Sequence, residues 1–113
     1  MKIISFNINS IRARPHQIEE IVKKHKPDAI GLQETKVHDD DFPYDIPESV
    51  GYKAHIHGQK GHYGVAILTK EEPIEVQKGF KTDTEDSQKR FISVTLKKDR
   101  KKIHILNGYF PQG

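Results

Sequence analysis

The opening third of the chain alternates between apolar runs and an amphipathic segment. Residues 2–7 and 29–33 are short and largely apolar, which favours strands, and the segment between them begins with Pro15 and ends before Pro27. Apolar residues recur in that segment at helical spacing, at Ile18, Ile21 and Val22. Proline suits a first helical turn, and a second proline ends the helix. A strand, a helix and a strand in this order predict a parallel, right-handed unit.

The rest of the chain is richer in strand patterns. Residues 35–51 form a segment rich in Asp and Pro, which predicts a loop. Strands are expected at residues 52–57, 65–69, 91–96 and 102–106, with a short one near 74–76. The strands at 91–96 and 102–106 are expected to form a hairpin around Asp99 and Arg100. One helix against five or six strands predicts an α/β or α+β fold with a mixed sheet.

Composition limits the size of the core and the classes of protein. Hydrophobic residues make up 34% of the 113 residues and charged residues 31%, so we expect one modest core. The absence of cysteine excludes disulfides and thiolate metal sites. No apolar run approaches the roughly 18–20 residues of a membrane span, and the first apolar stretch is too short for a signal peptide. We therefore expect a cytoplasmic protein with no membrane partner.

The charge balance permits a polyanionic partner without requiring one. The formal net charge is +3 and the pI is near 9.1. Basic residues at 97–98 and 100–102 flank Asp99. A solvated hairpin turn is the main interpretation of this run, and contact with a DNA backbone is the alternative.

Polar side chains follow three of the expected strands. Glu34 closes the second apolar run, Asn7 and Asn9 follow the first, and Tyr109 follows the last. Open α/β sheets place ligands at such strand ends. A carboxylate and a carboxamide are oxygen ligands suited to Mg²⁺, and a phenol donates a hydrogen bond at neutral pH. The pattern indicates a site for a hard cation and a phosphate.

Each of these residues also has a structural interpretation. Glu34 could pair with Lys36, Asn7 could end its strand through local backbone bonds, and Tyr109 could be a half-buried aromatic. His55 and His57 share one face of a strand, yet nothing in the pattern supports zinc. Lys60 lies in the tight loop after that strand and could approach a substrate.

Five ordered segments resemble the exonuclease III branch of the exonuclease–endonuclease–phosphatase superfamily. They are SFNIN at residues 5–9, RARPH at 12–16, GLQETKVHD at 31–39, HGQKGHYGVA at 57–66 and NGYFPQG at 107–113. The resemblance implies about half of a four-layer α/β sandwich, as one mixed β-sheet with one or two helices on its outer face. Residues 1–113 would then be the amino-terminal part of a single domain.

The resemblance also implies an activity and its residues. The family hydrolyses phosphodiesters in double-stranded DNA with Mg²⁺ (or Mn²⁺), as a 3′→5′ exonuclease, a 3′-phosphatase and an abasic-site endonuclease. By motif position Glu34 would bind the metal with support from Asn7, and Tyr109 would be catalytic at the phosphate. Gln112 and Arg90 would contact DNA.

Family motifs that supply the general base and the catalytic histidine are missing from these residues. We therefore expect residues 1–113 alone to be inactive, in need of the carboxyl-terminal half of the domain, and open to oligomerisation. A sibling metal-dependent phosphoesterase and a non-catalytic nucleic-acid-binding fragment are the alternatives. Ser10, where many relatives carry glycine, is one departure from the family pattern.

Overall fold

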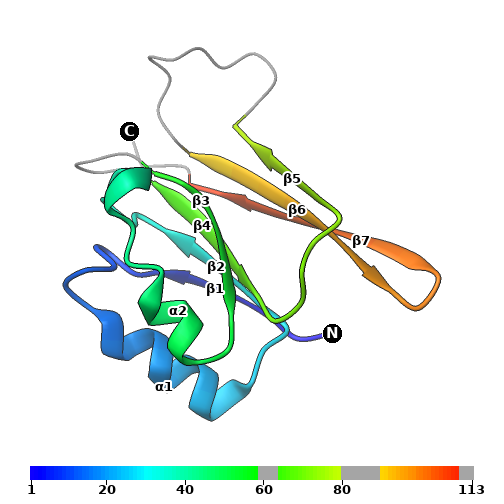
Figure 1. Cartoon of the computed structure of the whole chain (residues 1–113), viewed down its shortest axis with the longest axis horizontal. Coiled ribbons are helices and arrows are strands. Elements are labelled where there is room, and N and C mark those ends of the chain that lie inside the picture. The colour runs from blue at the N-terminus through cyan, green and yellow to red at the C-terminus, as the bar shows by residue number, and fades with distance from the viewer. Residues whose placement is uncertain (59–63, 80–89, 110–113) are drawn as a thin grey trace.

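A computed structural model of the chain describes residues 1–58, 64–79 and 90–109 (Figure 1). The elements follow in the order β1 (Ile3–Asn7), α1 (Pro15–His25), β2 (Ala29–Gln33), the short 3₁₀ helix η1 (Asp39–Asp41), α2 (Asp45–Ser49), β3 (Lys53–His57), β4 (Val65–Thr69), β5 (Glu75–Lys78), β6 (Phe91–Lys98) and β7 (Lys101–Gly108). No helix in these ranges is long and apolar enough to cross a membrane.

The expected strand–helix–strand unit is confirmed. β1 pairs with β2 in parallel, with Ile3 opposite Ala29, and α1 connects them. The helix begins at Pro15, and its C-cap residue, Lys26, adopts φ 45° and donates its backbone N–H to the carbonyl of Val22. A left-handed residue in this position is a common helix end.

β1 and β2 belong to a mixed four-stranded sheet in the order β1-β2-β4-β3. β4 pairs antiparallel with both β2 and β3. Both helices cover one face of this sheet, as Figure 1 shows. The core under the helices joins α1, the α2 region and the sheet, and its buried side chains include Ile18, Ile30, Leu32, Phe42 and Leu68. The mixed sheet and its helices on one face agree with the expected fold class.

The structure differs from the expectation of one sheet, because β5, β6 and β7 form a separate antiparallel sheet. Alternate residues of β6 and β7, such as Ile92, Val94 and Ile105, pack against Val65 and Ile67 of the first sheet. Strands with one apolar face can bury it against another sheet, which yields two layers. The second sheet therefore covers the inner face of β2 and β4.

The inner face of β1 lies outside this second core. Ile3 is 48% exposed, and Ser5 and Asn7, on the same face, are exposed as well.

The segment expected to be a loop, residues 35–51, contains η1 and α2. Strand β5 begins one residue later than expected and extends to Lys78.

Candidate functional site

The candidate residues lie at one end of the two-sheet sandwich. Asn7 ends β1 opposite Gln33, and Glu34 follows directly. Tyr109 comes one residue after β7, and in Figure 1 the arrowheads of β1, β2 and β7 point toward the same side of the molecule. The structure therefore brings together three residues that the sequence singled out, from two different sheets.

The Glu34 carboxylate is the centre of this group. Its pKa is lowered from the ordinary value, chiefly by a hydrogen bond with the Tyr109 side chain and further by hydrogen bonds from Asn7 and Lys36, while partial burial opposes the shift. Lys36 Nζ lies 3.5 Å from Glu34 Oε2. Glu34 is therefore ionised at neutral pH and faces a phenol. The predicted ion pair with Lys36 is therefore present beside this phenol.

The loops that carry these residues are held in unusual backbone conformations. Of the six described non-glycine residues with positive φ, four lie here: Asn9, Ser10, Glu34 and Lys36, at φ 48°, 81°, 54° and 56°. Such residues cost about 1–3 kcal/mol each and persist only where the surroundings fix them. Two backbone hydrogen bonds fix them to each other, from Ser10 N to Glu34 O at 2.8 Å and from Ile11 N to Thr35 O at 3.2 Å.

Side-chain contacts tie the same two loops together. Lys36 Nζ donates to Asn9 Oδ1 at 2.6 Å, and the backbone N–H of Asn9 donates to Asn7 Oδ1 at 3.0 Å. Asn7 therefore makes the local backbone bond expected of a strand end and also contacts Glu34. These contacts hold the two loops against each other.

The other predicted contact residues have different outcomes. Arg90 lies beside the site, because its carbonyl accepts the backbone N–H of Tyr109 at 2.8 Å. Lys60 and Gln112 fall outside the described residues.

His55 is half-buried and its Nε2 lies 3.0 Å from Thr69 Oγ1, at the far end of β4 from Glu34. Burial lowers the pKa of His55.

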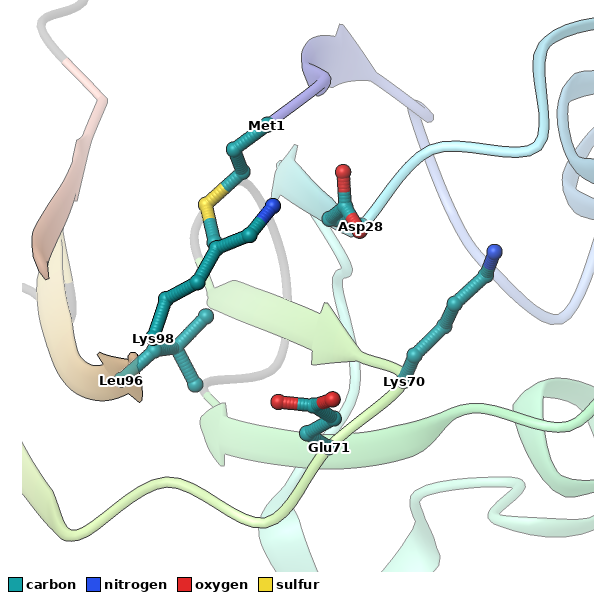
Figure 2. Close-up of a pocket in the computed structure, with 6 residues that line it drawn as sticks. All are labelled: Met1, Asp28, Lys70, Glu71, Leu96 and Lys98. Carbon is teal, nitrogen blue, oxygen red and sulfur yellow. The ribbon is translucent and has the colours of Figure 1, made fainter. Parts of the chain in front are cut away.

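A hollow lies at the other end of β2 and is separate from this site. Figure 2 shows the residues that line it, which are Met1, Asp28, Lys70, Glu71, Leu96 and Lys98. In this view Asp28 lies between the two lysines. Asp28 precedes β2 and Glu34 follows it, so the rise of an extended strand separates their Cα atoms by about 20 Å.

The donors present fit a hard divalent cation in part. Glu34 is an ionised carboxylate and Asn7 a carboxamide, which are oxygen ligands of the kind Mg²⁺ takes together with water and phosphate. Among residues 1–58, 64–79 and 90–109, no three His, Cys, Asp or Glu side chains cluster around one point. The described residues thus supply one negative charge, that of Glu34, toward such a site.

Two carboxamides that sequence reasoning missed stand beside the candidate residues. Gln33 precedes Glu34, and Asn107 lies two residues before Tyr109. They contact each other across the two sheets. The signal that could have indicated this contact is Gly31, since a glycine inside an apolar strand often marks a close approach.

Comparison with known proteins decides the family. A model of the Endonuclease/Exonuclease/phosphatase family matches residues 4–105. The chain belongs to this family. Over 113 residues it is 59% identical to Exodeoxyribonuclease III of Haemophilus influenzae, covering 100% of this chain and 42% of that protein. It is 34% identical to the DNA-(apurinic or apyrimidinic site) endonuclease of Dictyostelium discoideum, covering 98% of this chain and 30% of the relative.

Solved structures agree with this family assignment. An AP endonuclease from Archaeoglobus fulgidus matches with a TM-score of 0.87 and 39% identity, over 100% of this chain and 42% of that one. The 3′ phosphatase NExo from Neisseria, bound to a product DNA hairpin, matches with a TM-score of 0.84 and 32% identity, over 96% and 41%. The family resemblance and the fold class are confirmed. The chain spans less than half the length of these relatives.

Proposed function

We propose that the protein to which this chain belongs hydrolyses phosphodiester bonds in double-stranded DNA and acts in DNA repair. It would combine 3′→5′ exodeoxyribonuclease activity with cleavage at abasic sites. The observation that carries the proposal is the meeting of the Glu34 carboxylate with the Tyr109 phenol at one end of the sandwich. Relatives whose names describe exodeoxyribonuclease and abasic-site endonuclease activity support it.

The described residues take distinct roles in this proposal. Glu34, ionised because of its lowered pKa, and Asn7 would hold Mg²⁺ (or Mn²⁺). The metal would supply Lewis-acid stabilisation of charge at the phosphate. Tyr109 would donate its phenol hydrogen bond to a phosphate oxygen, where it is worth most as negative charge develops. Arg90, whose backbone bonds to that of Tyr109, would contact the DNA together with Lys60 and Gln112.

The remaining catalytic groups would come from a carboxyl-terminal half of the same domain, as the greater length of the relatives suggests. A missing general base alone removes about 10²–10⁴-fold of rate. Residues 1–113 by themselves would therefore show no sustained turnover. The exposed inner face of β1 would favour oligomerisation of the isolated chain. We place the whole protein in the cytoplasm.

A chimera tests the proposal directly. In it, this chain replaces the matching 113 residues of Haemophilus influenzae Exodeoxyribonuclease III. We expect Mg²⁺-dependent release of nucleotides from nicked duplex DNA and cleavage at an abasic site, both abolished by Glu34→Gln. Asp28→Asn makes the same chemical change at the other end of β2 and should leave both activities in place.

Two results would contradict the proposal. Hydrolysis of small phosphate esters with no action on DNA would indicate a sibling phosphoesterase instead. Binding of duplex DNA with a steep salt dependence and no cleavage would indicate a binding module.

A further inference from the structure

A buried carboxamide joins the two sheets close to the candidate site. Asn107 of β7 is 5% exposed. Its Nδ2 donates to the carbonyls of Leu32 and Ala66, both at 2.8 Å, and its Oδ1 accepts from Gln33 Nε2 at 2.6 Å. Both donor hydrogens and one acceptor position are therefore used, and all three partners belong to the opposite sheet.

The opposite sheet is shaped to receive this side chain. A Cβ at Gly31 would lie 3.2 Å from both Cγ and Oδ1 of Asn107, so a larger residue would push the carboxamide away. Gln33 Nε2 also lies 3.1 Å from Ser5 Oγ on β1. The contact thus extends from β7 through β2 to the strand that ends at Asn7.

We propose that Asn107 is a positioning residue that sets the separation between the Tyr109 phenol and the Glu34 carboxylate. This inference rests on the proposed function. Asn107 lies two residues before Tyr109 and its partner Gln33 lies one residue before Glu34, so their hydrogen bond fixes the two chain segments on which the site depends. The bond from Tyr109 N to Arg90 O ties Tyr109 to its own sheet and cannot set this distance.

A matched control separates positioning from simple stabilisation. Thr69 is fully buried, and its hydroxyl donates to the carbonyl of Glu71 at 2.6 Å. It pairs with Ala29, at the end of β2 away from Glu34. Thr69→Val therefore removes a buried polar contact without touching the candidate site.

The experiment compares Asn107→Leu, Gln33→Met and Thr69→Val in the chimera. Crystal structures give the separation between Tyr109 Oη and the Glu34 carboxylate, and steady-state assays on duplex DNA give kcat and KM. We expect Asn107→Leu to widen that separation and lower kcat by about 10–100-fold with little change in KM, since small misplacements of a reacting group have effects of this size. Gln33→Met, which keeps both carbonyl bonds of Asn107, should have a smaller effect in the same direction.

Thr69→Val should lower the melting temperature and leave the separation and kcat unchanged. If Asn107→Leu does not fold, Gln33→Met decides. The inference is overturned if the folded variants resemble Thr69→Val in both separation and kcat. A chimera that is inactive before any substitution would defeat the proposed function, while the crystallographic separation would still decide the role of Asn107.

Discussion

The two ends of β2 carry carboxylates whose pKa values are both lowered, yet they are built differently. At the start of the strand, the backbone N–H of Lys2 donates to Asp28 Oδ2 at 2.7 Å and is the main cause of its lowered pKa. Asp28 N donates to Lys2 O at 2.7 Å, and Lys70 N donates to Asp28 O at 3.2 Å. This end is held by backbone bonds between neighbouring chain segments.

The end at Glu34 depends on a partner from the other sheet. The main cause of its lowered pKa is a phenol that follows the last strand of the other sheet. Its backbone lies at positive φ, a conformation that costs energy. A lowered carboxylate pKa can therefore arise from backbone bonds within one sheet or from contact between two sheets. The assembled end also gathers four of the six described non-glycine residues with positive φ, a kind of strain that is common at functional sites.

The largest expected effect comes from removing the hydroxyl of Tyr109, with removal of the Tyr52 hydroxyl at the other end of β2 as the control. Tyr109→Phe in the chimera should lower kcat by about 10²–10³-fold, as loss of a hydrogen-bond donor to developing charge does. It should also raise the pKa of Glu34 toward its ordinary value, because its largest stabilising bond is lost. Steady-state kinetics and NMR titration measure the two effects.

Tyr52→Phe is the control, since the buried Tyr52 hydroxyl donates to Pro27 O at 2.5 Å near the Asp28 end. It should reduce stability by about 1–2 kcal/mol, through an unsatisfied carbonyl, and leave kcat unchanged. Equal losses of kcat in both variants would contradict the distinction between the two ends.

Gly58→Ala should give the largest loss of stability. A Cβ there would lie 2.7 Å from Asp39 Oδ1 and closer still to the carbonyl of Val37, at the end of β3 on the Glu34 side. We expect a loss of about 1–3 kcal/mol by overpacking. Gly51→Ala meets no atom within 4 Å and suffers only from its φ of 85°, so it should be milder in urea unfolding. The reverse order would contradict the close approach at Gly58.

Asp28→Asn should have a smaller effect that depends on pH. Because the folded pKa of Asp28 lies below its ordinary value of 3.8, its charge stabilises the fold above that value, and the contribution is lost as pH falls through the folded pKa. The variant should be less stable by about 1 kcal/mol at pH 7 and equal to the unsubstituted chain at the lowest pH. A difference that persists in strong acid would point to another cause.

The smallest effect should come from Ser10→Gly. Ser10 adopts φ 81°, which favours glycine. Relief of about 1 kcal/mol of left-handed strain is partly offset by the greater freedom of glycine in the unfolded chain. A gain of about 0.5 kcal/mol in unfolding free energy is expected. A loss of stability would show that the serine side chain contributes to the loop.

Local periodicity predicted the elements that depend on neighbouring residues. The spacing of Ile18, Ile21 and Val22 indicated α1, and alternation indicated most strands. Helix α2 was missed because its five residues include Pro47 and are too few to show a repeat. The division into two sheets was missed because β5–β7 look the same in sequence whether they extend the first sheet or cover it.

Part of the candidate site could be predicted from the rule that the ends of neighbouring strands meet at one edge of a sheet. Glu34, Asn7 and Tyr109 follow from that rule, which needs only the order of the strands. The contact between Gln33 and Asn107 depends on how one sheet faces the other, which no local pattern encodes. The positive φ values at Ser10 and Glu34 accompany a hydrogen bond between their loops, and only the fold brings those loops together.

Paramagnetic broadening by Mn²⁺ tests the central claim most directly. In the ¹H–¹⁵N spectrum of the chimera, Mn²⁺ at sub-stoichiometric amounts should broaden the amides of Asn7, Glu34 and Tyr109 and spare those around Asp28 and Glu71. Glu34→Gln should abolish the broadening at all three positions. Broadening centred on Asp28, or unchanged by Glu34→Gln, would show that the convergent residues are not a cation site.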